Sequence, residues 1–374
     1  MSNYVWIDNL YSAIKWRYND EKNIITLYAF NGTWKTLLSK QFDSLNTDGN
    51  IRVLRYNAFF EDLFYWDNES SELKINEFYD EYKIIQSEWL EKNIAEIFKR
   101  ILNTKIEPEI DFEERSIKFN FASWDERAEN WIKISRWEES IFIWSIFLAI
   151  LEEALSQLTE DEPSDYFKNI EYIVIDDPVS SMDDNRIISL AVDLINLIAD
   201  YKKKEKTKNL SLDEWDKKNV KFLITTHHAL FYNVLYNSFR EELKKNNSEW
   251  LVLFKNWYDN YTLDSQEDSP FWYHILVLNE IKRAIDNWNI QKYHYNLFRW
   301  LLEKTAVFVW EKSWKNCLNN INWIEEQKEI FIKKINEFSH NRVEIFEYRE
   351  LSYDDKEIFT DVFNGFIEKY KFTS

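Results

Sequence analysis

Glycine is nearly absent from this sequence. Only 3 of the 374 residues are glycine, whereas roughly 26 are expected at the average frequency of about 7%. Tryptophan, normally far rarer than glycine, occurs 18 times, and the two residue types together number 21. That total is close to the expected glycine count. We therefore hypothesise that many tryptophans stand for glycine, as when a gene whose UGA codons specify glycine is translated with a table that reads UGA as tryptophan.

Cysteine, targeting signals and long apolar runs are also lacking. Cys317 is the single cysteine, which excludes an internal disulfide framework and fits a reducing cytoplasm. The first residues have neither a basic flank nor an apolar core, so no signal peptide is expected. The longest apolar stretch, residues 141–151, is interrupted by Ser145 and is far shorter than the ~20 residues that a bilayer requires. We expect a cytoplasmic protein that does not contact membranes.

Positive charge is in deficit, because the formal net charge is -19. The averaged field would repel nucleic acid, so any RNA site has to be a local patch. The densest basic run, residues 202–208, contains Glu205 and is expected in a polar, solvated loop. The chain length and a hydrophobic content of 45% predict two domains with a substantial core.

A phosphate-binding loop is predicted near the N-terminus, after an expected entry strand and hairpin over residues 1–23. An apolar strand pattern, residues 24–28, is followed by a turn and then by Lys35 and Thr36, which begin a predicted helix. In such a loop the backbone N–H groups surround phosphates, the lysine reaches the outer phosphates and the hydroxyl binds Mg²⁺. The residues predicted to contact nucleotide are Asn31, Gly32, Thr33, Trp34, Lys35 and Thr36.

Trp34 contradicts this prediction as the sequence is written. The loop requires glycine immediately before the lysine, so that the main chain can approach the phosphate, and an indole would fill that space. The block from Ser135 to Glu138 has the same fault, because it would be Ser-x-Gly-Glu if Trp137 were glycine. Two interpretations stay open: a degenerate site that binds no nucleotide, or glycines translated as tryptophan. Trp66 lies in an aromatic run and is expected to be tryptophan.

Four further motifs have the order and spacing of an ABC-type ATPase. A strand over residues 52–57 ends at Asn57, a candidate for contacting the metal and the attacking water. Ser135, Trp137 and Glu138 precede an apolar helix; in ABC heads this block binds the γ-phosphate held by the other protomer, which implies a head-to-head dimer. Taken alone, serine followed by glutamate three residues later is only a helix-capping box.

The third motif is a buried-strand pattern, residues 171–175, that ends in two carboxylates. Asp176 is predicted to hold Mg²⁺ and Asp177 to orient or deprotonate the attacking water. Asp183 follows in the loop expected at the dimer interface. Another apolar strand, residues 220–224, precedes His227, the predicted γ-phosphate sensor.

The predicted fold is therefore α/β. An ABC-type P-loop ATPase head covers residues 1–265, with a helical and strand insert at about 40–130 that is too short for a long coiled-coil arm. A polar boundary at residues 264–270 precedes a mainly α-helical domain, residues 266–374. On physical grounds alone, Arg299 and Glu303 form a surface ion pair on one helix, and His340 is a cation at a helix C-terminus.

Four runs together resemble the PrrC-type anticodon nucleases: residues 56–64, 132–139, 175–185 and 293–299. In the second run Trp137 departs from the family's glycine. The resemblance implies an ABC-type head joined to a C-terminal ribonuclease domain that cuts a tRNA in its anticodon loop as an antiviral response. It also implies silencing by a type I restriction-modification complex, with ATP or GTP and Mg²⁺ at the head controlling activation.

The resemblance places the nuclease site on Arg299, Glu303 and His340. These residue types suit metal-free cleavage by the ribose 2′-OH, which needs a base, an acid and a cation on the developing phosphorane. Lys292, Tyr293, His294 and Tyr295 lie just upstream and are candidates for RNA stacking and phosphate contacts; alternatively, they are half-buried helix residues.

The leading functional hypothesis is a nucleotide-gated tRNA anticodon-loop endoribonuclease that works as a homodimer or a higher oligomer. Two alternatives come from other classes. One is an ABC-type ATPase of the DNA-repair or chromosome type without nuclease activity, and the other is a nucleotide-dead scaffold in which Trp34 is genuine.

Overall fold

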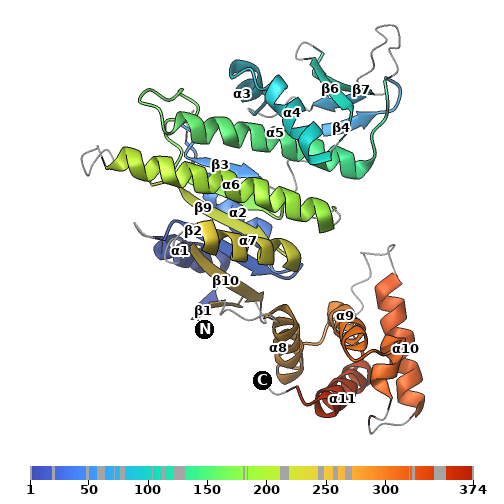
Figure 1. The fold of residues 1–374 in the computed structure, drawn as a ribbon. Coiled ribbons are helices and arrows are strands. Elements are labelled where there is room, and N and C mark those ends of the chain that lie inside the picture. Colours follow the sequence, from blue (N-terminus) through green and yellow to red (C-terminus); the bar gives the residue numbers. More distant parts are fainter. Residues whose placement is uncertain are drawn as a thin grey trace. The chain divides into compact units, whose positions relative to one another are not determined.

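The chain divides into two compact units, Met1–Gln266 and Glu267–Ser374 (Figure 1). The computed structural model describes residues 2–18, 22–47, 50–56, 64–70, 72–75, 81–102, 104–111, 114–121, 131–179, 182, 184–210, 219–242, 248–255, 260–265, 272–319, 321, 325–340 and 351–372. Within these ranges, none of the helices combines the length and apolar character that a bilayer crossing requires.

The first unit is organised on a seven-stranded sheet with the order β1-β11-β10-β2-β9-β8-β3. The five strands from β10 to β3 are parallel, and β11 and β1 continue the sheet in antiparallel fashion. The strands are β1 (Ser2–Val5), β2 (Ile24–Ala29), β3 (Val53–Tyr56), β8 (Tyr172–Asp176), β9 (Lys221–Thr226), β10 (Ser248–Lys255) and β11 (Asn260–Ser265).

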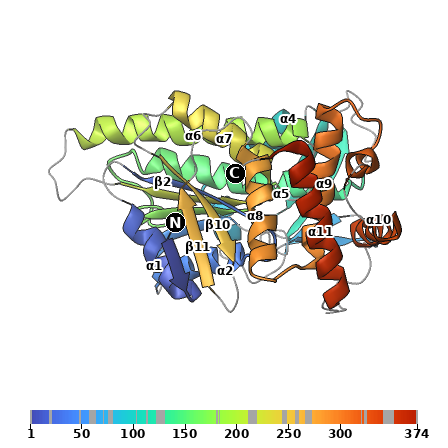
Figure 2. The same cartoon turned by 90° about the horizontal axis from the view of Figure 1, so that it is seen from below.

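Helices cover both faces of this sheet, as the continuous burial of its parallel strands requires. Helices α1 (Ile7–Arg17) and α2 (Lys35–Gln41), followed by the 3₁₀ turn η1 (Phe42–Leu45), pack on one face through Leu10, Ile14 and Leu38. Helices α5 (Arg136–Gln157), α6 (Asp184–Asn209) and α7 (Ala229–Glu242) cover the opposite face (Figure 2). All six residues of β2 are buried between these layers.

A second, antiparallel sheet with the order β4-β5-β7-β6 belongs to the insert. The insert consists of β4 (Phe64–Asp67), β5 (Glu72–Ile75), α3 (Glu81–Ser87), α4 (Glu91–Leu102), β6 (Ile106–Asp111) and β7 (Ser116–Phe121). Phe142 of α5 packs edge to face on Phe98 of α4 and Phe119 of β7, with ring centroids 5.4 and 5.1 Å away. The insert is thereby anchored on α5.

Two local predictions are wrong. The expected hairpin over residues 1–23 is a strand followed by helix α1, because Leu10 and Ile14 lie one helical turn apart and are buried. The basic run 202–208 belongs to α6 and is no loop. Lys202 is buried there: its ammonium donates to Glu205 at 2.7 Å and to the carbonyl of Val220 at 2.6 Å.

The second unit is helical in its described parts. It contains α8 (Trp272–Asp286), α9 (Lys292–Phe308), the 3₁₀ turn η3 (Trp314–Leu318), α10 (Glu325–His340) and α11 (Tyr353–Tyr370). Aromatic side chains fill its core around Phe298 of α9, which lies 5.3–5.6 Å, centroid to centroid, from the rings of Phe331, Phe359, Phe363 and Phe366.

Phe298→Ala should destabilise the second unit by about 3–5 kcal/mol, because the buried ring leaves a cavity among aromatic neighbours that cannot fully collapse. Denaturant unfolding measured by near-UV circular dichroism gives the change in free energy. Phe308→Ala on the same helix, where the ring is 75% exposed, is the matched control and should change stability by less than ~0.5 kcal/mol. Equal losses in the two variants would contradict this description of the core.

Candidate functional sites

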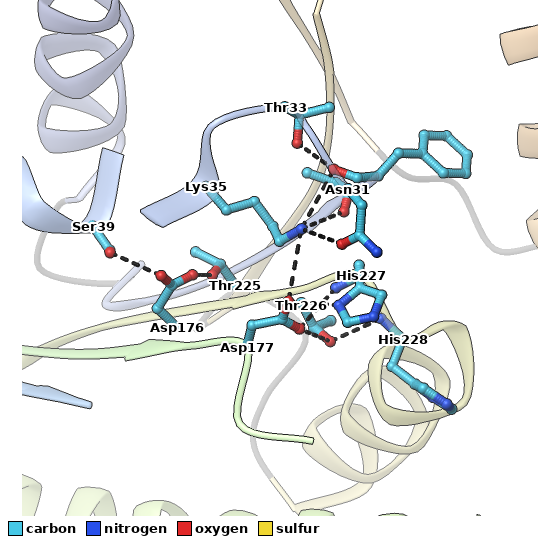
Figure 3. Close-up of polar contacts among 12 residues, drawn as sticks. Asn31, Thr33, Lys35, Ser39, Asp176, Asp177, Thr225, Thr226, His227 and His228 are labelled. Carbon is cyan, nitrogen blue, oxygen red and sulfur yellow. Dashed lines mark hydrogen bonds and ion pairs between the residues drawn. The ribbon is translucent and has the colours of Figure 1, made fainter. Parts of the chain in front are cut away.

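Three of the residues predicted for the ATPase site, Lys35, Asp177 and His227, meet at the carboxyl edge of the main sheet (Figure 3). Lys35 follows β2, Asp177 follows β8 and His227 follows β9. These strands are parallel and lie in the order β2-β9-β8, so their ends come together although they are far apart in sequence. Ligands of open α/β sheets bind at this edge.

The loop between β2 and α2 has a tight local conformation. The backbone N–H of Thr33 donates to the carbonyl of Phe30 at 3.3 Å, and its hydroxyl donates to the same oxygen at 2.6 Å. Gly32 has a φ of 81° and Trp34 a φ of 65°. Trp34 is the residue before the first turn of α2, and its exposed indole lies under the ammonium of Lys255, 4.0 Å from the ring centroid.

The ammonium of Lys35 is held inside the loop. It donates to the carbonyl of Ala29 at 3.1 Å, lies 3.5 Å from the Asn31 side-chain oxygen and forms an ion pair with Asp177 at 3.7 Å. Burial lowers the pKa of Lys35, and the nearby carboxylates of Asp177 and Asp176 oppose that shift. The loop therefore presents a cation where a phosphate-binding lysine is expected.

Asp176 is buried among hydroxyl groups. Ser39 donates to one carboxylate oxygen at 3.1 Å, Thr225 donates to the other, and Thr36 also hydrogen-bonds to this carboxylate. Burial raises the pKa of Asp176, and these hydrogen bonds act in the opposite direction. The carboxylate of Asp176 and the hydroxyl of Thr36 are the kind of oxygen ligands that Mg²⁺ prefers.

Ser39 and Thr225 were not predicted as site residues. Thr225 could have been found, because it ends the strand beside that of Asp176 and the carboxyl ends of adjacent parallel strands meet. Ser39 lies three residues after Thr36 in α2, so helical spacing places both hydroxyls on one side of the helix.

Asp177 contacts the predicted sensor directly. Its Oδ2 lies 2.5 Å from Nδ1 of His227, and its Oδ1 accepts a hydrogen bond from the backbone N–H of His227 at 3.2 Å. Burial alone would raise the pKa of Asp177, but the hydrogen bonds and charge of His227, together with Lys35, lower it below the ordinary value. Asp177 thus stays ionised and orients the imidazole.

The Ser135 block forms a capping box at the start of α5. The hydroxyl and the backbone N–H of Ser135 donate to Glu138 at 2.6 and 2.7 Å. Trp137 is 37% exposed, with the guanidinium of Arg186 located 4.2 Å from its ring centroid. The γ-phosphate role of this block remains a prediction. Asn57 and Asp183 lie outside the described residues.

A polar cluster in the second unit joins α9 to α10. Arg299 donates from Nε to Glu303 at 2.9 Å and from Nη1 to the side-chain oxygen of Asn336 at 3.3 Å. His340 is the last residue of α10, and its side chain lies outside the described part. Asn336 was not predicted, because no motif connects it with Arg299.

A relative from Escherichia coli, named "Anticodon nuclease", is 32% identical over 349 residues, which cover 84% of this chain and 80% of that protein. The chain belongs to the anticodon nuclease family. No family model matches it. Among solved structures, the SMC head domain from Thermotoga maritima aligns with 66% of this chain and 91% of that one at 10% identity and a TM-score of 0.29.

In this anticodon nuclease family member the predicted α/β fold of the first unit and the helical C-terminal region are confirmed, and the ABC-type assignment of the head stays a prediction. The four residues predicted to contact RNA differ in their exposure to solvent. Lys292 is exposed, and the half-buried Tyr293 donates its hydroxyl to Glu280 at 2.7 Å. His294 and Tyr295 are buried in the helical core, so neither ring offers a face to a base in this conformation. Of the four residues predicted to contact RNA, Lys292 and Tyr293 are the two that stay candidates.

Proposed function

We propose that this protein is a nucleotide-gated tRNA anticodon-loop endoribonuclease. The observation that carries the proposal is the Arg299–Glu303 pair, which is hydrogen-bonded to α10 near His340 in a chain of the anticodon nuclease family. A dimeric head that hydrolyses ATP or GTP would control the cleavage. We place it in antiviral defence in the cytoplasm, with a type I restriction-modification complex as the silencing partner.

The cleavage chemistry needs no metal. The ribose 2′-OH attacks the adjacent phosphorus and loses its proton to a base, while the 5′-oxygen leaves with a proton from an acid. Glu303 and His340 are suited to these two proton transfers, and the guanidinium of Arg299 to the charge on the phosphorane. The products are a 2′,3′-cyclic phosphate and a 5′-OH.

Among the described head residues predicted to contact nucleotide, those at positions 34 and 137 do not fit a nucleotide with Mg²⁺, and the others do. Thr36 and Asp176 would hold the metal, Lys35 would bind the outer phosphates, and Asp177 would orient the attacking water. When bound, Mg²⁺ neutralises charge on the phosphates. The side chain of Trp34 stands where the main chain has to approach a phosphate.

The substrate is inferred from chemistry and from the family. A net charge of -19 disfavours a general nucleic-acid surface, so the bases of an RNA loop would have to be recognised locally. Lys292 and Tyr293 begin the helix that carries Arg299. Unstacked loop bases can be bound by such an aromatic and cationic pair.

The test is cleavage of total tRNA from a bacterial host, with the ends of the fragments sequenced and their phosphates identified. One cut within an anticodon loop, leaving a cyclic phosphate, is expected for the protein with an intact phosphate loop and added ATP or GTP. Hydrolysis stimulated by DNA, with all tRNA intact, would favour the DNA-repair or chromosome type of ATPase. Absence of nucleotide binding from protein made in its native cell would favour the scaffold.

A further inference from the structure

Tryptophan dominates the left-handed backbone conformations of this protein. Five of the eight non-glycine residues with positive φ in the described ranges are tryptophans, with φ angles between 53° and 72°: Trp6, Trp34, Trp89, Trp288 and Trp310. In this region Cβ crowds the following carbonyl oxygen, so glycine is the usual residue and bulky side chains are outliers. Genuine tryptophans are not expected to be concentrated at positions where the backbone is left-handed.

Two of these residues follow helices in the hydrogen-bonded arrangement known as the Schellman motif. After α8, Trp288 N–H donates to Ile285 at 2.9 Å and Asn289 N–H to Ala284 at 2.8 Å. After α9, Trp310 N–H donates to Val307 at 3.3 Å and the following N–H to Ala306 at 2.8 Å. The residue at this position is left-handed and is usually glycine.

The other three positions also favour glycine. Trp89 follows α3, and the next N–H donates back to Ile85 at 3.1 Å. Trp6 precedes α1 with φ 72° and ψ 147°, close to a region that essentially only glycine adopts. Trp34 occupies the phosphate-loop position where glycine is required.

The side chains of the five residues contribute little to the core, since their exposed fractions range from 38% for Trp288 to 94% for Trp310. Two other tryptophans behave differently. Trp144 is fully buried in α5, 4.8 Å from the ring of Tyr56, and Trp250 is buried in β10, where its indole N–H donates to Ser248 at 3.0 Å. Neither has a positive φ.

We propose that the protein made in its own cell has glycine at positions 6, 34, 89, 288 and 310, and tryptophan at positions 144 and 250. The gene would then use one codon for glycine and another for tryptophan, and the printed sequence shows tryptophan for both. This assignment does not depend on the proposed function. It makes the phosphate loop intact at position 34.

Mass spectrometry of peptides from protein isolated from its native cell tests the assignment. Glycine masses are expected for the peptides that contain positions 34, 288 and 310, and tryptophan masses for those that contain 144 and 250. Tryptophan at position 288 or 310 would overturn the assignment. Glycine at both 144 and 250 would also overturn it, because backbone conformation would then not distinguish glycine positions from tryptophan positions.

Recombinant variants give a second measurement. Trp288→Gly and Trp310→Gly should each raise the melting temperature of the second unit by roughly 4–8 °C, as relief of left-handed strain predicts, whereas Trp144→Gly should lower that of the first. Lys371 ends α11 in the same left-handed conformation without being tryptophan, so Lys371→Gly is the matched control. This variant should also raise the melting temperature of the second unit. A fall in melting temperature for both Trp288→Gly and Trp310→Gly would overturn the assignment.

A different observation supports a second inference, which rests on the proposed function. Arg299 is hydrogen-bonded on one side to Glu303 of its own helix and on the other to Asn336 of α10. Position 340 follows Asn336 by four residues, so the two positions share a helix face. We infer that Asn336 is a positioning residue that fixes the guanidinium of Arg299 relative to the α10 face carrying His340.

Asn336→Ala should lower kcat for tRNA cleavage by roughly 10-fold with KM and melting temperature unchanged, and Asn336→Asp, which keeps the acceptor oxygen, should restore much of the rate. All variants are made in the Trp34→Gly chain, with ATP or GTP added. Full kcat in Asn336→Ala, beside an active Trp34→Gly parent, would overturn this inference alone. No tRNA cleavage by the Trp34→Gly parent would instead overturn the proposed function, and this inference with it.

Discussion

Trp34→Gly is expected to convert a chain that binds no measurable nucleotide into one that binds and hydrolyses ATP or GTP. The other elements of the loop are already in place: Lys35 is buried with its ammonium in the loop, and Thr36 contacts Asp176. Removing the indole and its Cβ lets the main chain close on a phosphate at a residue that is already left-handed. Titration calorimetry should show an affinity gain of at least ~100-fold, about 2.8 kcal/mol.

The controls separate the loop from a general effect of removing tryptophan. Trp16→Gly removes a surface indole within α1 that is 87% exposed, against 46% for Trp34, and should leave nucleotide affinity unchanged. Trp34→Ala keeps a Cβ at the left-handed position and should restore less binding than glycine does. If the printed chain and Trp34→Gly bound nucleotide equally, the space around position 34 would not be the limiting feature.

Loss of RNA cleavage with retention of nucleotide hydrolysis is expected when the proposed nuclease residues are replaced in the Trp34→Gly chain. Arg299→Ala, Glu303→Gln and His340→Ala should each slow single-turnover cleavage of an anticodon stem-loop by about 10²–10⁴-fold, the range typical of general acid–base and charge-stabilising groups. The residues predicted to hydrolyse nucleotide belong to the other unit, so hydrolysis measured by phosphate release should persist.

Lys304→Ala is the matched control for the nuclease variants. Lys304 is exposed and follows Glu303 on the same helix, so its replacement changes the local charge without touching the cluster and should leave the cleavage rate within about twofold. Arg299→Lys should recover only part of the activity, because an ammonium cannot reproduce the planar guanidinium fork. Full cleavage by His340→Ala would contradict the assigned nuclease site.

The head was predictable because its site follows a simple rule. Residues 24–28, 171–175 and 220–224 are mostly apolar runs followed by polar residues, and they form most of the strands β2, β8 and β9. Parallel strands place such ends at one edge, so Asp177 and His227 meet there even though fifty residues separate them.

The unpredicted features depend on packing between segments with no shared motif. Strand β1 pairs with β11 from the far end of the first unit, which no local pattern reveals. Lys202 is buried because the carbonyl of Val220 and the carboxylate of Glu205 accept from it. The contact of Arg299 with Asn336 depends on how α9 and α10 cross, and helical periodicity does not specify that crossing.

The pairing of β1 with β11 has a practical consequence for handling the protein. Strand β1 contains only four residues and lies at the edge of the sheet, so it covers the edge of the longer strand β11, in which three of six residues are buried. Short edge strands limit edge-to-edge association between molecules. Removing residues 2–5 would expose the backbone donors and acceptors of β11, so a shortened N-terminus would favour intermolecular strand exchange and aggregation during purification.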